Sequence, residues 1–355
     1  EEPRGRAEAL RQTLESAQEL TDRTCAALSG LAERARGMEA GMRPVQECTQ
    51  ALSRAHSNID AALQVASKAL AHYDAARTLE KVVLTGPGAG LEEYLAALER
   101  LEAAREFLAA NQGLKSAEPT LQSTQRLLSR AKQQCQSMFR DKLESSKVEL
   151  NPEQFRDGED GEGSAFTDLA PLELVRSEDI GVVIQLADIL GKGETKESCL
   201  ETYSASRAAA FQGVLMELGW DTLPGEEVAR MDWAHLQRRV DRWLVVLRAA
   251  SRLASAEKDL AELIFSEPEC DDAFHRVVAA GLASVFEEGV GVARSKKTPE
   301  KVFVLLDMLR VVGQVKADLD DIFISTGGEG MQKRLEQLDA TLRRAARGTF
   351  AELGR

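Results

Sequence analysis

The amino-acid sequence predicts an all-α fold, and three observations support this class. Alanine, leucine, glutamate and arginine, which are good helix formers, dominate the 355 residues. Apolar residues recur at spacings of three and four along most of the chain, as they do on one face of a helix. No stretch shows the alternating pattern of a strand. The length allows two or three compact domains or one elongated helical array.

Composition narrows the function. The formal net charge is −13, and this acidity argues against nucleic acid as a partner, because phosphate backbones require a concentrated basic surface. The five cysteines are scattered without close pairing, which fits a reducing compartment rather than a disulfide framework. The most apolar window, GVVIQLADIL, is about half as long as a membrane span. We therefore expect a soluble cytosolic protein.

The N-terminal region predicts a coiled-coil helix. Its apolar or small positions alternate in steps of four and three, which defines a heptad seam. They are Leu10, Leu14, Ala17, Thr21, Thr24, Leu28, Leu31, Ala35, Met38 and Met42. Pro44 then marks a bend or a restart, because proline disturbs a helix interior. A second series follows, made of Val45, Cys48, Leu52, Ala55, Ile59, Ala62, Ala66, Leu70 and Tyr73. Such a narrow seam requires a partner helix.

Further helices are expected over 119–146, 172–190, 195–218, 225–265, 273–292, 299–312 and 331–353. In the sequence TPEK, Thr298 is expected to cap a helix whose first turn holds Pro299. We divide the chain into an N-terminal coiled-coil helix (1–43), a first helical bundle (44–149), an acidic flexible linker (150–170) and middle helical bundles (171–355).

Two sequence motifs resemble enzyme sites. LTGPGAGLEEYL, residues 84–95, has the glycines of a phosphate loop but lacks its preceding strand and its lysine, so we interpret it as a corner between helices. Asp318, Asp320 and Asp321 in DLDDIF suggest an all-α enzyme that uses an aspartic acid as a proton donor. The chain is only 5% aromatic, which disfavours the carbocation cavity that such chemistry needs. No catalytic, metal or cofactor site is predicted.

A cluster of positive charge stands out in this acidic chain. Arg294, Lys296 and Lys297 could contact an acidic partner or an anionic membrane. The alternative, which we favour, is a solvated loop before a helix, because three charges anchor a membrane weakly. The four histidines show no metal-type spacing with each other or with cysteines. Cys199 and Cys270 are expected to be small buried residues.

Four separated blocks, in the right order, resemble one family. They are HYDAARTLEKVVLTGPGAGLEEYLAALERLEAAREFL, CLETYSASRAAAFQGVLMELG, MDWAHLQRRVDRWL and SKKTPEKVFVLLDML. Together they are similar to exocyst complex component seven, the seventy-kilodalton subunit of the exocyst. The residues within the blocks are most similar to those of green-lineage members. The last block is the most specific. The departures are Leu309, where many members have tyrosine, and RLASAEKDL after Trp243.

The resemblance implies an elongated rod of stacked antiparallel helical bundles with an N-terminal coiled-coil helix, of the type found in tethering complexes. It also implies a non-catalytic subunit of the exocyst, which holds secretory vesicles at the plasma membrane before SNARE-mediated fusion. The expected location is the cytoplasm, with peripheral recruitment to the plasma membrane and to vesicles. The family's C-terminal bundles, to which binding of phosphatidylinositol bisphosphate and Rho-family GTPases is attributed, are expected to lie beyond this chain.

The same resemblance implies other exocyst subunits as partners, above all exocyst complex component eight. The predicted partner-binding seam consists of Leu10, Leu14, Leu28, Leu31 and Met38. Two arrangements of this seam stay open at this point: pairing with the partner's long helix, or folding back onto residues 45–73. A helical subunit of another tethering complex or scaffold is the alternative function.

Overall fold

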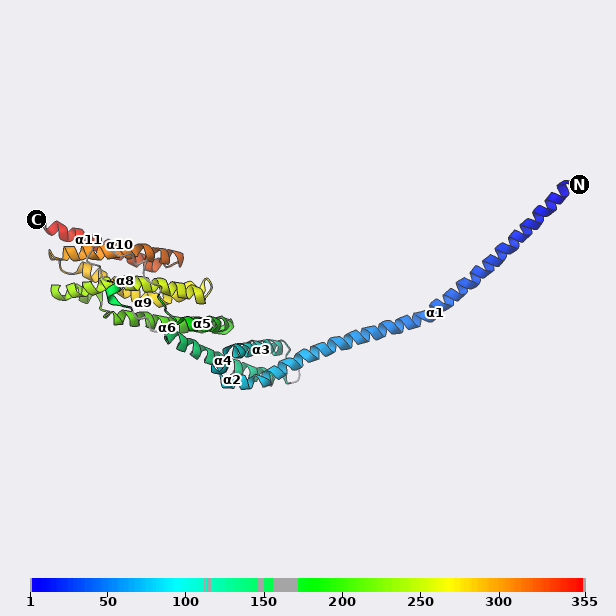
Figure 1. Cartoon of the computed structure of the whole chain (residues 1–355), viewed down its shortest axis with the longest axis horizontal. Helices are drawn as coiled ribbons and strands as arrows, with labels where there is room; N and C mark the ends of the chain where they lie inside the picture. Colours follow the sequence, from blue (N-terminus) through cyan, green and yellow to red (C-terminus); the bar gives the residue numbers. More distant parts are fainter. Residues whose placement is uncertain (1, 112, 114–115, 146–149, 156–171, 354–355) are drawn as a thin grey trace.

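The computed structural model describes residues 2–111, 113, 116–145, 150–155 and 172–353. Every regular element in these ranges is a helix, so the predicted all-α class is confirmed. Figure 1 shows a long, thin molecule in which α1 (Glu2–Thr78) projects away from a stack of helices, with the two termini at opposite ends. The predicted elongated rod is confirmed as well. No helix in these ranges is long and apolar enough to cross a membrane.

The stack begins where α1 ends. A corner formed by α2 (Glu80–Thr85) leads into α3 (Leu91–Ala110), which packs antiparallel against α4 (Ala117–Glu144). The next layer contains α5 (Ser177–Leu190) and α6 (Lys196–Glu217), both in contact with α4. Because these helices have apolar stripes on more than one side, each layer buries a face against its neighbours on both sides.

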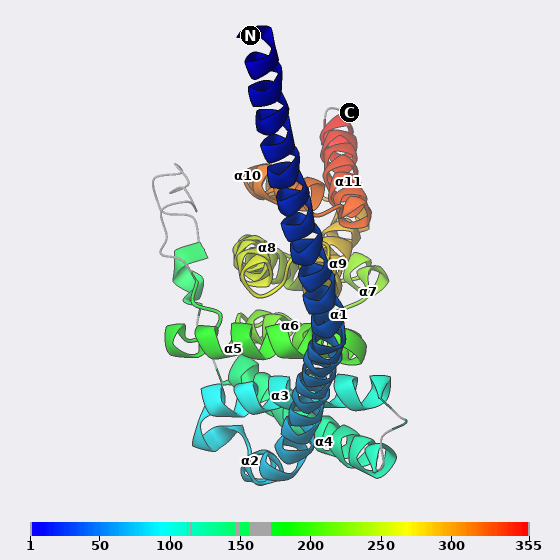
Figure 2. The same cartoon turned by 90° about the vertical axis from the view of Figure 1, so that its right-hand side faces the viewer.

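The second part of the stack repeats this design. The short α7 (Gly225–Ala229) packs on α9 (Glu269–Arg294), which also contacts α6 and α8 (Trp233–Ile264). The hairpin of α10 (Lys301–Ser325) and α11 (Glu329–Leu353) then covers α8 and α9. Figure 2 shows these layers in order, from α3 and α4 to α10 and α11. One cluster of buried apolar residues runs through all of them, from Ala75 to Ala346.

Buried polar side chains tie the layers together. Arg207 on α6 is 1% exposed and donates two hydrogen bonds to Glu257 on α8, at 3.2 and 2.5 Å. A buried charge must be paired in this way, because an unpaired one is strongly unfavourable. Trp243, which is fully buried, donates from Nε1 to the carbonyl oxygen of Val285 at 2.8 Å. These contacts join α8 to α6 and to α9.

Several helix boundaries differ from the sequence-based prediction. The helix expected over 225–265 is two helices, because Asp232 accepts a hydrogen bond from the backbone N–H of His235 at 2.9 Å and starts α8 there. The helix expected over 299–312 extends to Ser325. It begins at Lys301, and the hydroxyl of Thr298 is buried without a partner, so the predicted Thr298 cap is wrong.

The start of the predicted acidic linker is anchored. Residues Pro152–Phe155 form a 3-10 turn that packs against α8, and the ring of Phe155 is 1% exposed. Arg248 donates from Nη1 to the carbonyl oxygen of Phe155 at 2.9 Å. The rest of the predicted linker, residues 156–170, lies outside the described residues. The four-part division of the chain stays a prediction.

Candidate protein-interaction site

The projecting part of α1 is the most unusual surface of the molecule. From residue 6 to residue 68 every residue is exposed, except that Gly30 is half-buried. The helix joins the stack only through its last turns, where Ala75 and Ala76 are buried and His72 stacks on Phe107 with 4.5 Å between the ring centroids. A long helix gains little stability from backbone propensity alone and normally depends on packing of one face. The projecting part of α1 has no such packing within the described residues.

One heptad register runs along the whole projecting helix. Beyond Met42 the steps of three and four continue without a break through Val45, Thr49, Leu52, His56, Ile59, Leu63, Ala66, Leu70 and Tyr73. The second predicted series differs from this register at three places, where it contained Cys48, Ala55 and Ala62 instead of Thr49, His56 and Leu63. In an unbroken helix such a repeat places all its members on one face. We call this face, from Leu10 to Tyr73, the α1 seam.

Pro44 lies beside the α1 seam and not within it. The helix passes through Pro44 without restarting, although proline cannot donate the backbone hydrogen bond to the carbonyl of Ala40. Figure 1 shows that α1 bends partway along its length, and an interior proline is a recognised cause of such bends. Residues 10–42 and 45–73 therefore belong to one helix and do not fold back on each other.

The five predicted seam residues all lie on this exposed face. Their exposed fractions run from 62% to 70% in Leu10, Leu14, Leu28, Leu31 and Met38. Burying one such side chain is worth about 1.5–3 kcal/mol, so a seam of this length holds a large unused driving force for association. Their role in binding a partner stays a prediction.

The α1 seam is wider than a two-stranded coiled coil requires. The positions just before Leu28, Met42, Leu63 and Leu70 are Ala27, Gly41, Ala62 and Ala69, so in these four heptads a third small residue borders the seam. An apolar stripe with three positions per heptad is typical of helices that pack in a bundle. Close approach of more than one helix is therefore sterically possible along much of α1.

The glycine-rich motif at residues 84–95 is a helix corner, as predicted. Gly86 has a φ of 85°, which favours glycine, and it ends α2 before a 3-10 turn at Pro87–Ala89. Tyr94 on α3 is buried and its hydroxyl donates to Oε1 of Gln134 on α4 at 2.7 Å. Glu92 and Glu93 occupy the first turn of α3, where a phosphate would otherwise bind.

The three aspartates of DLDDIF lie on one helix and not at a helix end. Asp318 and Asp321 are exposed on α10, and Asp320 is half-buried beside them. Neither the groove between α7, α9 and α11 nor the groove between α5 and α8 is lined by these side chains. The described residues also contain no cluster of three or more histidine, cysteine or acidic side chains with metal-site geometry.

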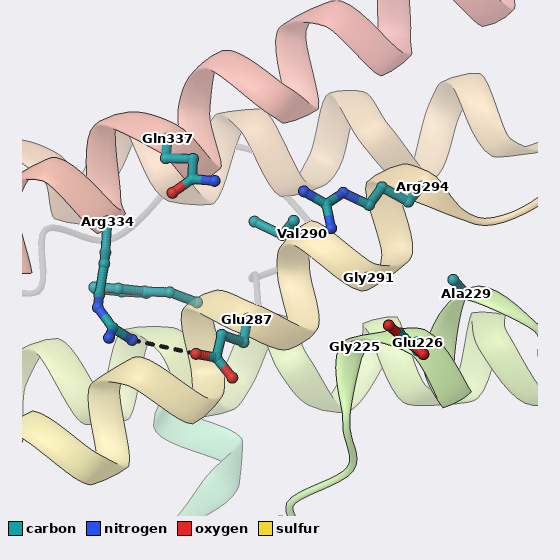
Figure 3. A pocket seen from close by; sticks show the side chains of 10 residues that line it. Gly225, Glu226, Ala229, Glu287, Val290, Gly291, Arg294, Arg334 and Gln337 are labelled. Atoms are coloured by element: carbon teal, nitrogen blue, oxygen red, sulfur yellow. Dashed lines mark hydrogen bonds and ion pairs between the residues drawn. The ribbon is translucent and has the colours of Figure 1, made fainter.

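The structure separates the three residues of the basic cluster. Lys297 forms an ion pair with Glu352 on α11, and Lys296 is exposed to solvent. Arg294, at the end of α9, instead lines a groove of about 490 Å³ between α7, α9 and α11. Figure 3 shows its side chain extending along α9 toward Val290 and Gln337.

Sequence reasoning missed Lys301, which explains much of the SKKTPEKVF block. Its ammonium group is fully buried and donates to the carbonyl oxygens of Ala293 at 3.2 Å and Ser295 at 2.7 Å. Both carbonyls lie at the C-terminal end of α9, where backbone carbonyls lack partners within the helix and need other donors. The sequence around Lys301 did not indicate this burial, because lysine is normally exposed.

The fold and the exposed seam define a class of protein: a helical rod with a long projecting helix that carries an exposed apolar seam. Comparison with known proteins names the family. Residues 62–145 match the family model "Exocyst complex component Exo70 N-terminal", and residues 241–355 match the model for the C-terminal part of the Exo70 exocyst complex subunit. The chain belongs to the Exo70 family of exocyst subunits.

Individual relatives agree with this assignment. The chain is 29% identical to exocyst complex component EXO70A1 of Arabidopsis thaliana over 94% of its own length and 57% of that protein. It is 28% identical to exocyst complex component 7 of Homo sapiens over 37% of its length and 17% of the human protein. The crystal structure of the S. cerevisiae exocyst component Exo70p superimposes with a TM-score of 0.58 at 15% identity, over 79% of this chain and 49% of the yeast chain.

The match to the yeast structure shows the shared helical-rod fold and nothing finer, because the sequence identity is low. The chain spans little more than half the length of EXO70A1. The predicted resemblance to exocyst complex component seven is confirmed. The plant relatives agree with the predicted similarity to green-lineage members.

Proposed function

We propose that this chain is a non-catalytic subunit of the exocyst that tethers secretory vesicles at the plasma membrane before SNARE-mediated fusion. Membership of the Exo70 family supports the assignment to the exocyst, and the long, thin shape supports a tethering mechanism. A tether must span a distance and bind at both ends, which requires stiff, extended helices and docking surfaces. The single observation that carries the proposal is the exposure of the α1 seam over the projecting residues 6–68, which have no packing partners among the described residues.

The partner of the α1 seam is another exocyst subunit, and exocyst complex component eight is the candidate. A second solved structure reveals a motif common to the exocyst subunit Exo70p and the C-terminal domains of Exo84p. It superimposes on this chain with a TM-score of 0.55. A partner helix that buries the exposed leucines and methionines of the seam gains about 25 cal/mol per Å² of apolar surface.

In this proposal the protein works in the cytoplasm and reaches the plasma membrane and vesicles through its partners. Recruitment is peripheral, since the work is done by protein contacts.

Replacing Leu14, Leu28 and Leu31 together with aspartate tests the proposal. Three charges on one face of a helix prevent its burial, because an unpaired buried carboxylate is strongly unfavourable. We expect component eight to be lost when the variant chain is purified from cells through an affinity tag, while the circular dichroism spectrum and the thermal unfolding of the helical stack stay unchanged.

The matched control places the same charges on the opposite side of the same turns. Gln12, Ser16 and Ser29 are exposed and lie outside the α1 seam, so their replacement with aspartate is expected to leave co-purification intact. Recovery of component eight with the seam variant at the level seen with the control would refute the role of the seam.

A further inference from the structure

We propose that the groove between α7, α9 and α11 is a second interaction site, which binds a short polypeptide segment that has a carboxylate next to an apolar side chain. The groove has a volume of about 490 Å³, within the range of roughly 300–1,000 Å³ typical of ligand sites. It lies on the helical stack and is separate from the projecting α1, so it goes beyond the tethering role proposed above.

The floor of the groove is apolar and rigid. Phe286 is 2% exposed, and Val290 and Ala229 are half-buried beside it. The floor is held by backbone contact between α7 and α9, because a Cβ on Gly291 would lie 2.6 Å from the carbonyl oxygen of Gly225. A preformed apolar floor favours binding because little conformational entropy is lost on binding.

The rim of the groove is charged, and the charges are unevenly paired. Arg334 on α11 forms an ion pair with Glu287 on α9 at 3.2 Å, drawn as a dashed line in Figure 3. Glu226 lies 3.9 Å from Arg230, one turn along α7. Arg294 has neither a hydrogen bond nor an ion pair with any described residue. Its guanidinium therefore offers a fork of donors to an incoming carboxylate.

The surroundings of Arg294 strengthen the preference for an acidic ligand. Arg344 is exposed on α11 and follows Gln337 by seven residues, about two helical turns, which places both on the same face of the helix. Lys296 is exposed close to Arg294 in the chain. Of the four charged side chains that line the groove, Glu287 is paired with Arg334 and Glu226 lies near Arg230, so among the described residues Arg294 is the cation left for a ligand carboxylate.

A polypeptide segment fits this arrangement better than a membrane does. The apolar surface here is a recessed floor below a charged rim, so a flat bilayer surface would contact the rim and leave the floor unfilled. A single apolar side chain can reach the floor while a neighbouring carboxylate meets Arg294. This division into an apolar anchor and a few polar groups that fix orientation is typical of binding sites.

Fluorescence anisotropy with a labelled ten-residue peptide of alternating glutamate and leucine tests the proposal on the whole chain. We expect saturable binding that needs both residue types, so peptides with lysine in place of glutamate or serine in place of leucine should bind at least about tenfold more weakly. Arg294→Glu should weaken binding by at least about tenfold. Ala229→Met, which narrows the groove without changing charge, should also weaken it.

Arg343→Glu is the matched control, because Arg343 is an exposed arginine of α11 that pairs with Asp339 and does not line the groove. This variant should bind the peptide as the unaltered chain does. Thermal unfolding checks that each variant is folded, and Arg294→Gln replaces Arg294→Glu if the latter is not. Absence of saturable binding, equal binding of the serine peptide, or unchanged binding by both groove variants overturns the proposal. Phosphatidylserine vesicles that bind through Arg294 while the peptide does not would also overturn it.

Discussion

A buried pair of charged side chains connects two layers of this rod. Arg207 and Glu257 connect α6 to α8 in a site where neither side chain exceeds 1% exposure. Tyr203, one turn before Arg207 on α6, is also fully buried and packs edge-on against Phe265 at 5.1 Å between ring centroids. Burial, with the nearby carboxylate of Glu257, raises the pKa of the Tyr203 hydroxyl well above its ordinary value. Tyr203 and Arg207 both belong to the family block CLETYSASRAAAFQGVLMELG, and their burial explains that part of the block as packing of α6.

Lys301 gives the rod a distinctive pH dependence. Burial, with a smaller contribution from Lys297, lowers the pKa of Lys301 to about 8. In the unfolded chain a lysine has a pKa of about 10.4, so between pH 8 and 10.4 the unfolded state binds more protons than the folded state. The free energy of unfolding therefore rises with pH in this window. Below pH 8 the buried ammonium group is charged, and its burial lowers the free energy of unfolding.

We expect Lys301→Met to remove this dependence. Urea unfolding followed by tryptophan fluorescence should show that the unaltered chain gains roughly 2–3 kcal/mol relative to the variant between pH 7.5 and 10.5. Lys296→Met, an exposed neighbour, should give a pH profile parallel to that of the unaltered chain. Parallel profiles for Lys301→Met as well would mean that this lysine keeps an ordinary pKa in the fold.

At the scale of elements, close approach of helices depends on a few glycines. Gly291 on α9 faces the first residue of α7, and a methyl group there would lie 2.9 Å from the Cα of Gly225. Gly313 on α10, in contrast, is exposed, and a methyl group added to it would have nothing within 4 Å. The same substitution thus meets two opposite environments.

We expect Gly291→Ala to destabilise the fold by about 1–3 kcal/mol, because the contact between α7 and α9 must open. Gly313→Ala should stabilise it by about 0.5–1 kcal/mol, because alanine has the higher helix propensity. Urea midpoints and slopes for the two variants measure both effects. A gain of stability in both variants would contradict the close packing of α7 on α9.

Helix positions were more predictable than helix ends or burial. The heptad spacing located α1 and the apolar stripes located α4 to α6, because periodicity reflects which face meets the core. The break between α7 and α8 was missed, since the cap at Asp232 is a single local hydrogen bond inside a continuous apolar pattern. The groove at Arg294 could not be predicted, because it is formed by three helices that are brought together only by folding. The exposed seam was predictable because its pattern lies within one helix.

The whole molecule combines two mechanical parts. The stack has one continuous core, so forces applied at α10 and α11 are transmitted through packed layers to α3 and α4. The projecting α1 meets this stack only at its last turns, so it acts as an arm attached at one end (Figure 1). An arm of this kind can dock a partner without disturbing the stack, because their stabilities are nearly independent.

This independence predicts the result of removing the arm. Deleting residues 1–68 should change the thermal midpoint of the stack by less than about 2 °C, because the deleted side chains make no packing contacts with it. The helical circular dichroism signal should fall with the lost helix. In the intact chain, backbone amides of residues 6–68 should exchange with solvent much faster than those of α9, and a bound partner should slow them. A large loss of stack stability on deletion would show that α1 packs against the rod in solution, and the α1 seam would then not be free to bind another subunit.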